Sequence, residues 1–422
     1  MKKGCKFLSI VLIFVLSLSG CKGKSKENKF ETGNLSTDEQ ATWNIFNHNI
    51  TRGEGGYYYI ANSTSEYISS LVGELQDQKS YNIIMFMQDD GSKTVVCSKP
   101  ECKHNNKECP AWLTTGSEDN SEKKSGNGLT GYNGQQIYYY NGKLYVIYND
   151  EEKSGYSYLV EVTANGSYRK RLFEIGEVDK SYSLVFRDSS VYIYKREGST
   201  SGYDDITATI RRRSLDGNED EIIQSYTAMG ACIYAVKSYG DKLYFLEEEY
   251  KREKDANGKV TGQTFNRLGL FAYDYNTHNV EQVIDEEITD YTFDTDKGVL
   301  YYYICEDGLY KKDFSDGKIT KIYNKEENVT NVAQISYING KIYMSNSMFR
   351  GFYSVKPSKM IIKVLNESGT QENEINMLYK LGISETFFGD NNKIFYKSDI
   401  DDSMYYIDIN NPDVELSPIQ FN

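Results

Sequence analysis

The 422-residue sequence contains few prolines, histidines and tryptophans: five, three and two, respectively. It has no long segment in which apolar residues recur every three to four positions, so few helices are expected. It also has no surplus of basic residues. The net charge is −13, and it falls to −16 once the three lysines of the first twenty residues are excluded. Because nucleic-acid affinity depends on basic patches, this composition argues against a nucleic-acid partner.

Patterns typical of catalytic sites are missing as well. The sequence has no G-x-S-x-G, no H-E-x-x-H and no P-loop, so no catalytic residue is assigned. The segments Asp294–Gly298 and Asp399–Asp402 resemble fragments of calcium loops but lack the remaining spaced ligands, so hairpin turns are the better interpretation. His278 stands in a turn and is expected to face solvent.

The first twenty residues have the order of a secretory signal. Lys2, Lys3 and Lys6 form a basic start, and the apolar run 7–16 follows. That run is too short for a membrane span, which needs roughly 20 apolar residues. The tetrapeptide 18–21, Leu-Ser-Gly-Cys, resembles the lipobox of bacterial lipoproteins.

This resemblance implies cleavage before Cys21 and transfer to its thiol of a diacylglyceryl group carrying fatty acids of the palmitate type. We therefore expect a signal peptide at 1–20, a lipidated N-terminus with a Lys-rich tether at 21–41, and a folded body at 42–422. The expected location is the extracellular face of the cell membrane, with the lipid anchor in the bilayer. The bias toward Lys, Ile, Asn and Tyr is typical of a Gram-positive host of the clostridial kind.

Tyrosine is abundant, with 38 copies beside 18 Phe, and it marks a repeat. Each unit begins with a turn and an apolar–Tyr–apolar strand. A second strand follows and ends at Asp or Asn, in most units with Gly, which is a tight hairpin signal. The first parts of the seven units are 56–60, 142–146, 190–193, 241–245, 298–302, 340–344 and 392–396. The second parts are 83–86, 158–162, 210–215, 270–273, 309–312, 361–365 and 404–407.

From Tyr145 onward the units recur every 42 to 57 residues. Units of four short antiparallel strands at this period predict an all-β protein with the β-propeller fold. Seven four-stranded blades are expected, with six or eight as the alternatives, and a β-sandwich or solenoid as the rival fold. Segment 42–50 is expected to close the ring by adding a strand to the last blade, beside 404–409.

Strands of the Gly-Lys-Ile-Tyr type followed by a Leu-Tyr strand, as at Leu300-Tyr301 and Leu309-Tyr310, resemble the bacterial propellers likened to that of the low-density-lipoprotein receptor. The resemblance covers residues 50–420. The receptor's own Tyr-Trp-Thr-Asp signature is absent, so the resemblance implies a fold and no particular function.

One stretch, in or after the first blade, does not fit the repeat. An insert of about residues 97–131 contains the pattern C-x4-C-x-H-x4-C, formed by Cys97, Cys102, His104 and Cys109. Three thiolates and an imidazole make a complete tetrahedral zinc set, and a filled set of this kind is typical of structural metal. Disulfides form readily outside the cell, so a disulfide among these cysteines is the rival interpretation. Free thiols are the third.

Two remaining cysteines, Cys232 and Cys305, lie in strand-like runs and are expected to be buried small residues. Two functions fit the sequence as a whole. The favoured one is a surface binding or scaffold module for a peptide, protein or glycan, because tyrosine-rich faces give rigid amphipathic contacts. The alternative is a propeller-type glycan hydrolase or lyase, which requires two carboxylates roughly 5 to 10 Å apart.

Overall fold

The computed structural model describes twelve stretches of the chain, and all of them belong to one compact unit, Thr32–Asn422. They are residues 50–62, 81–114, 136–149, 156–177, 181–196, 205–325, 334–345, 360–377, 383–386, 393–398, 404–409 and 417–419. The expected signal peptide, Cys21, the tether and segment 42–49 lie outside the described residues. So do 115–135 of the insert and the acidic segment 399–402.

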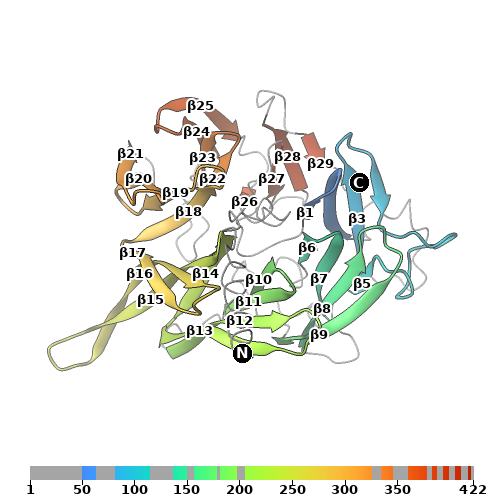
Figure 1. The fold of residues 1–422 in the computed structure, drawn as a ribbon, viewed down its shortest axis with the longest axis horizontal. Coiled ribbons are helices and arrows are strands. Elements are labelled where there is room, and N and C mark those ends of the chain that lie inside the picture. The colour runs from blue at the N-terminus through green and yellow to red at the C-terminus, as the bar shows by residue number, and fades with distance from the viewer. Residues whose placement is uncertain are drawn as a thin grey trace, which may run out of the picture. The chain divides into compact units, whose positions relative to one another are not determined.

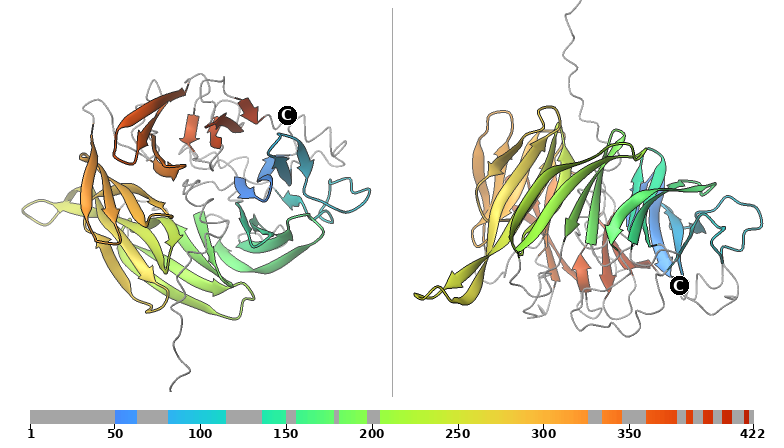
Figure 2. Two further views of the ribbon diagram at one scale, coloured as in Figure 1. Left: turned by 45° about the horizontal axis from the view of Figure 1, so that its top comes forward. Right: turned by 90° about the horizontal axis from the view of Figure 1, so that it is seen from below.

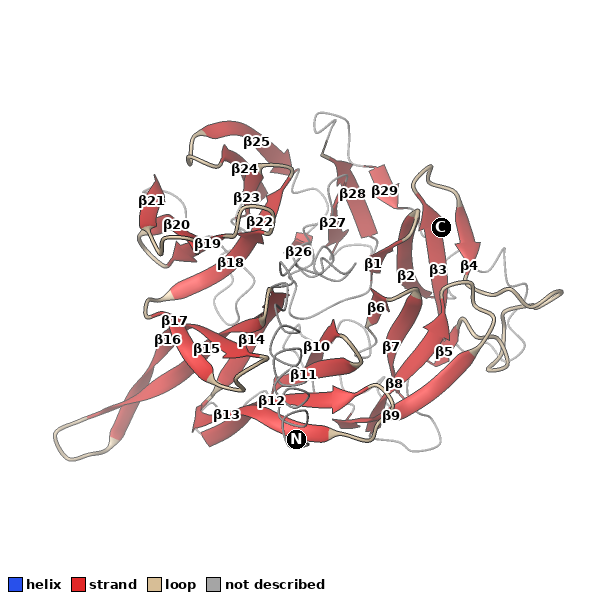
Figure 3. Cartoon of the chain, in the orientation of Figure 1, coloured by secondary structure: helices blue, strands red, loops and turns tan. Residues whose placement is uncertain are grey.

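Every regular element of the described residues is a strand, and none is a helix (Figure 3). Accordingly, this part of the chain contains no helix long and apolar enough to cross a bilayer.

The strands form seven antiparallel sheets, each built from consecutive strands. The first sheet has five strands: β1 (Ile50–Gly53), β2 (Gly56–Asn62), β3 (Tyr81–Gln88), β4 (Lys93–Val95) and β5 (Trp112–Thr114). The second has β6 (Ile137–Tyr140), β7 (Lys143–Asn149), β8 (Tyr156–Thr163) and β9 (Arg169–Glu177). The third has β10 (Ser181–Arg187), β11 (Ser190–Arg196), β12 (Asp205–Ser214) and β13 (Asp220–Met229). The fourth has β14 (Cys232–Tyr239), β15 (Lys242–Lys254), β16 (Val260–Asp274) and β17 (Val280–Ile284).

The remaining sheets have four strands each. The fifth has β18 (Ile288–Asp294), β19 (Val299–Ile304), β20 (Gly308–Asp313) and β21 (Ile319–Asn324). The sixth has β22 (Gln334–Ile338), β23 (Lys341–Ser345), β24 (Met360–Asn366) and β25 (Gln371–Met377). The seventh has β26 (Ile383–Thr386), β27 (Lys393–Ser398), β28 (Met404–Asp408) and β29 (Ser417–Ile419).

The predicted all-β propeller fold is confirmed, and the predicted seven four-stranded blades are correct in part. Six sheets have four strands, whereas the first has five. In every sheet the first part of the sequence repeat forms the second strand, and the second part forms the third strand. The repeat therefore marks the middle of each sheet, where apolar side chains are buried on both faces.

The sheets follow one another around a common centre (Figures 1 and 2). Their first strands lie innermost, so that β1 contacts β6, β10 contacts β14, and β18 contacts β22. The β15–β16 hairpin is the longest and extends beyond its neighbours (Figure 2).

The innermost strands have a free edge of backbone N–H groups, and buried donors of this kind need partners. Side chains from the preceding sheet accept several of them. They are Tyr139 N–H to Thr51 Oγ1 at 3.2 Å, Leu184 N–H to Tyr138 OH at 3.2 Å, Ile335 N–H to Asp290 Oδ2 at 2.8 Å and Tyr337 N–H to Thr292 Oγ1 at 3.3 Å. Neighbouring sheets are thus held in register by polar contacts as well as by apolar packing.

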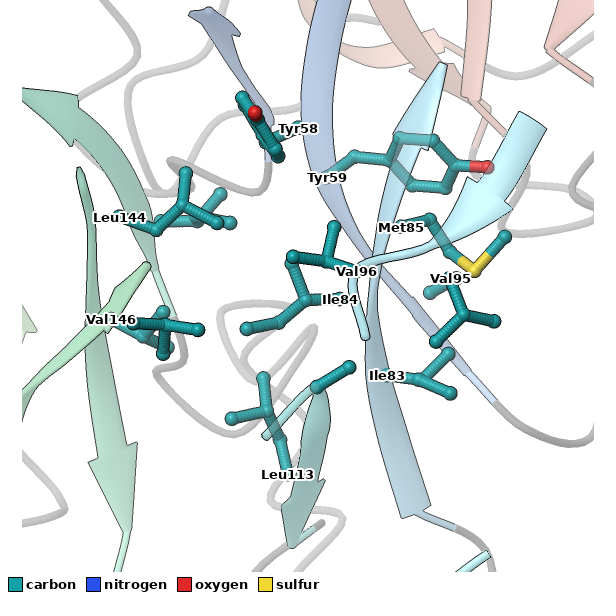
Figure 4. Packing of buried hydrophobic residues seen from close by; sticks show 14 of the residues in the cluster. Tyr58, Tyr59, Ile83, Ile84, Met85, Val95, Val96, Leu113, Leu144 and Val146 are labelled. Atoms are coloured by element: carbon teal, nitrogen blue, oxygen red, sulfur yellow. The ribbon is translucent and has the colours of Figure 1, made fainter. Parts of the chain in front are cut away.

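The fifth strand of the first sheet has a simple origin. β4 and β5 pair with the two halves of the same strand, β3: Met85 lies opposite Val95, and Ile83 lies opposite Trp112. Together they act as one outer strand that is interrupted by residues 96–111. Figure 4 shows Ile84 of β3 directed toward the second sheet and Ile83 directed to the opposite side.

Most of the segment predicted to close the ring, 42–49, lies outside the described residues, and Ile50 does not follow the prediction. Ile50 lies in β1 and pairs with Tyr59 of the first sheet, not with the last sheet. The strand 404–408 already has β27 on one side and β29 on the other, so its two edges are occupied. Among the described residues, the last sheet is built from the C-terminal segment, and its contacts with the first sheet are made by side chains. The ring of Tyr57 packs edge-on against Phe395, with centroids 4.8 Å apart.

The tyrosines serve mainly as core residues. Tyr57, Tyr291 and Tyr301 are among the largest fully buried side chains, and they lie between sheets. Among the tyrosines whose side chains are described, Tyr156 and Tyr168 are the exposed ones. The expected tyrosine-rich binding face is thus not seen in this part of the chain.

Candidate metal centre

The outer strand is interrupted by a loop whose two ends both hydrogen-bond to the same residue of β3, Ile84. The Ile84 N–H donates to the carbonyl of Ala111 at 2.9 Å, and the Ile84 carbonyl accepts from Val96 N–H at 3.0 Å. Both ends of the loop are therefore fixed to the middle of β3. All four of the Cys and His residues singled out in the sequence lie between these two ends.

The structure brings these four residues together. Their ligand atoms, from Cys97, Cys102, His104 and Cys109, all lie within 4.8 Å of one another. His104 Nδ1 lies 3.3 Å from the Cys109 sulfur. Cys109 is buried, and the other three are half-buried. The five cysteines that the structure describes all have free thiols, so no disulfide joins these sulfurs.

Tight turns of the loop position two of the cysteine ligands. Cys102 N–H donates to the carbonyl of Lys99 at 3.4 Å, and Cys109 N–H donates to that of Asn106 at 3.1 Å. His104 has a φ of 54°, in the left-handed region that non-glycine residues seldom adopt. Backbone strain of this kind clusters at ligand sites, where the surrounding structure maintains it.

The set fits a tetrahedral ion. With zinc–sulfur bonds near 2.3 Å, the sulfurs of a tetrahedral site lie about 3.8 Å apart, so side-chain shifts of about 1 Å would complete the geometry. The donor set also matches, since thiolate and imidazole are preferred zinc ligands. The backbone N–H groups of Lys99 and Ala111 approach the sulfurs of Cys97 and Cys109, respectively, as outer partners of metal ligands do.

Without metal, burial favours the uncharged forms of Cys97, His104 and Cys109. Burial raises the pKa of Cys109 to about 12, with the neighbouring Cys97 and Cys102 adding to the effect. Burial also raises the pKa of Cys97 and lowers that of His104. The imidazole is thus in its neutral, ligating form, whereas the thiols would release protons when a metal binds.

Sequence reasoning missed the residue that holds this loop from outside, Arg169 at the start of β9. Its guanidinium donates to the carbonyls of Trp112 and Lys107, the latter at 3.2 Å. It also lies over the ring of Tyr148, 5.5 Å from the centroid. Nothing in the local sequence around Arg169 signals this role, because the contact exists only once the first two sheets pack together.

The other sites considered from the sequence have ordinary roles. Cys232 is buried as expected, whereas Cys305 is only half-buried. His278 is exposed, and its Nδ1 lies 2.7 Å from the hydroxyl of Tyr273. The Asp294 carboxylate accepts from the N–H groups of Asp296 and Lys297, both at 3.1 Å. Residues 294–296 thus form the hairpin turn expected there.

No protein-family model matches the sequence, and no curated protein matches it. Solved structures do resemble the fold. A prolyl endopeptidase aligns with 99% of this chain at 10% identity and a TM-score of 0.52, and the chain spans 56% of that protein's length. The β-propeller domain of the Trilobed protease from Pyrococcus furiosus aligns at 13% identity over 89% of this chain and 97% of that domain, with a TM-score of 0.49. Identities this low show a common fold and nothing more.

Proposed function

We propose that this chain is a lipoprotein anchored at the extracellular face of the cell membrane, and that its propeller is a binding or scaffold module for a peptide, protein or glycan. The propeller fold supports a module of this kind, since such rings present loops from several sheets on one rigid frame. We further propose that the five-stranded first sheet is one blade of a seven-bladed ring, with the interrupted outer strand counted once.

The buried carboxylates described on the innermost strands favour binding over glycan hydrolysis. Asp290 contacts Lys237 and accepts from Ile335 N–H, and Asp294 holds a turn. Carboxylates with structural partners of this kind are poorly placed to transfer protons to a substrate. Because few described tyrosines are exposed, the contact surface is expected to come from polar loops of the acidic body, which favours partners with basic groups.

Zinc is the cofactor that the loop fits best. The observation that carries this is the convergence of three thiols and one imidazole within 4.8 Å on a loop closed at Ile84. The four donors fill a tetrahedral site and leave no position for a substrate, so the role is structural. Cys97, Cys102, His104 and Cys109 would hold the ion, which would fasten the two halves of the outer strand.

Metal analysis of the full-length chain, purified from membranes in detergent, tests the zinc assignment. The wild type is expected to contain about one zinc per chain, and Cys102→Ser and His104→Ala to contain much less. Cys305→Ser and His278→Ala serve as matched controls, because these residues lie outside the loop. A wild type without bound metal would end the zinc assignment.

The anchor is tested by feeding cells a labelled fatty acid. The wild-type chain should incorporate the label and sediment with membranes, whereas Cys21→Ala should do neither. Cys5→Ala is the control, since Cys5 belongs to the expected leader and not to the lipobox. Equal labelling of Cys21→Ala would contradict the lipoprotein assignment.

A glycan assay separates the two functions. The purified chain is incubated with cell-wall and host glycans, and both retention and cleavage products are measured. Binding without products supports the module. Products that appear with the wild-type chain, at a rate proportional to its concentration, would favour the hydrolase or lyase.

A further inference from the structure

The guanidinium of Arg169 is half-buried at the seam between the first two sheets. The guanidinium donates to one carbonyl of the first sheet and to one carbonyl of the metal loop, and it lies over the ring of Tyr148. Among the described residues no carboxylate lies within ion-pair distance of it. A positive charge partly removed from water is stabilised by a nearby negative charge, and no described carboxylate supplies one.

A zinc-loaded loop would supply such a charge. A zinc ion with three thiolates and a neutral imidazole has a net charge of −1. Cys109 is near enough to interact electrostatically with Arg169. The two carbonyls that Arg169 binds belong to Lys107 and Trp112, which stand two residues before and three after Cys109. The cation therefore lies beside the part of the loop that contains the most buried ligand.

A second contact from the same sheet positions Cys97. The turn after β8 places Gly166 against the start of the loop, where Ser98 N–H donates to the Gly166 carbonyl at 3.3 Å. Gly166 has a φ of +66°, and a Cβ added there would lie 2.1 Å from the carbonyl oxygen of Val96. The approach is so close that only glycine fits.

We infer that Arg169 is the counter-ion and a positioning residue of the metal centre, and that the Gly166 turn holds the first ligand in place. This inference rests on the proposed zinc site and adds that residues of the second sheet control the affinity of that site for zinc. Outer partners of metal ligands typically change affinity by about 10- to 100-fold. By linkage, a metal that binds better when the seam is formed also stabilises the seam.

The test compares Arg169→Gln, Arg169→Lys and Arg171→Gln in the full-length chain. Arg171 is the matched control because it lies on the same strand, and its guanidinium is 3.2 Å from the Tyr158 ring centroid within the second sheet. Zinc affinity is measured by competition with a chromophoric chelator. The absorption of the cobalt-substituted chains reports whether the three thiolates still bind the ion.

Arg169→Gln should bind zinc at least about tenfold more weakly than wild type, with an unchanged cobalt spectrum, and Arg171→Gln should stay within about twofold. Arg169→Lys should recover most of the loss, because it keeps the charge while losing the forked donor geometry. Equal losses in the Gln and Lys variants would overturn the counter-ion assignment. Wild-type affinity in Arg169→Gln would overturn the inference while leaving the zinc site intact, and a wild type that binds no zinc would remove both.

Gly166→Ala tests the positioning contact independently of charge. Gly317 is its control, since it has a similar φ of +71° in the corresponding turn of the fifth sheet, and nothing lies within 4 Å of an added Cβ. Gly166→Ala should lower zinc affinity by about tenfold, and Gly317→Ala should leave it unchanged. Equal affinity in the two variants would show that the turn does not position Cys97.

Discussion

The ammonium of Lys237 and the carboxylate of Asp290 lie 3.5 Å apart on the innermost strands of the fourth and fifth sheets, and both side chains are almost fully buried. Lys237 also donates to the carbonyl of Tyr291 and lies over that ring, 4.4 Å from the centroid. The other oxygen of Asp290 accepts from Ile335 of the sixth sheet. One pair of charges thus connects three consecutive sheets.

Lys237→Met should therefore destabilise the propeller strongly. It leaves a buried carboxylate without its cation, and breaking a buried pair in this way costs about 3 to 5 kcal/mol. The midpoint of denaturant unfolding measures the effect. Lys242→Met is the control, since Lys242 pairs with Glu281 on the surface, and exposed pairs contribute about 0 to 1 kcal/mol. Similar shifts for the two variants would contradict the connecting role of the buried pair.

Gly369 makes the same close approach between the sixth and fifth sheets that Gly166 makes between the second and first. It has a φ of +85°, and an added Cβ would lie 1.8 Å from the carbonyl oxygen of Ile322. Gly369→Ala should destabilise the chain by about 1 to 3 kcal/mol more than Gly317→Ala, which carries only the left-handed strain. Thermal unfolding of the two variants measures the difference. Equal melting temperatures would show that the Gly369 turn can move away from Ile322 without loss of stability.

Glu247 predicts a dependence of stability on pH. Burial raises its pKa above the ordinary value of 4.5, although a hydrogen bond from Gln224, 2.7 Å long, opposes the shift. A carboxyl with a raised folded-state pKa stabilises the fold fully below its unfolded pKa, and this contribution is lost as pH rises through the folded pKa. One such group changes the free energy of unfolding by at most about 1.4 kcal/mol per pH unit.

Glu247→Gln removes this titration. The variant should be more stable than wild type at pH 7 and should lose the advantage as the pH falls toward 4.5. Glu221→Gln, on the exposed surface of the third sheet, controls for the loss of one negative charge. A constant difference between Glu247→Gln and wild type across this range would contradict the assignment.

The sequence predicted the middle of each sheet well because the signals there are local. Asp216-Gly217 ends a strand through its turn chemistry, wherever the sheet lies in the ring. The Cys and His ligands were also recognisable, because all four lie within thirteen residues. Local pattern could not show that β4 and β5 are halves of one strand, since each has only three residues. Arg169 was not predictable for a different reason: its role depends on the packing of two sheets.

The seam between the first and last sheets yields the last prediction. Segment 42–50 was expected to close the ring with a strand, yet the described contacts between the first and last sheets are made by side chains. Tyr57 packs against Phe395. Two cations also contact its ring: the guanidinium of Arg52 lies 4.6 Å from the centroid and the ammonium of Lys393 lies 5.6 Å from it. Arg52 in turn pairs with Asp89, with one contact of 3.0 Å.

Tyr57→Ala should therefore loosen the last sheet before the others. Truncating a buried aromatic ring costs about 3 to 5 kcal/mol, and here the lost contacts are concentrated at one seam. Hydrogen exchange should show reduced protection in β27, with little change in β15 on the far side of the ring. Tyr57→Phe keeps the ring and should retain most of the protection. The described partners of β27 are β26 and β28, and neither comes from the N-terminal segment. Unchanged protection of β27 in Tyr57→Ala would therefore mean that contacts other than the Tyr57–Phe395 packing hold the ring closed.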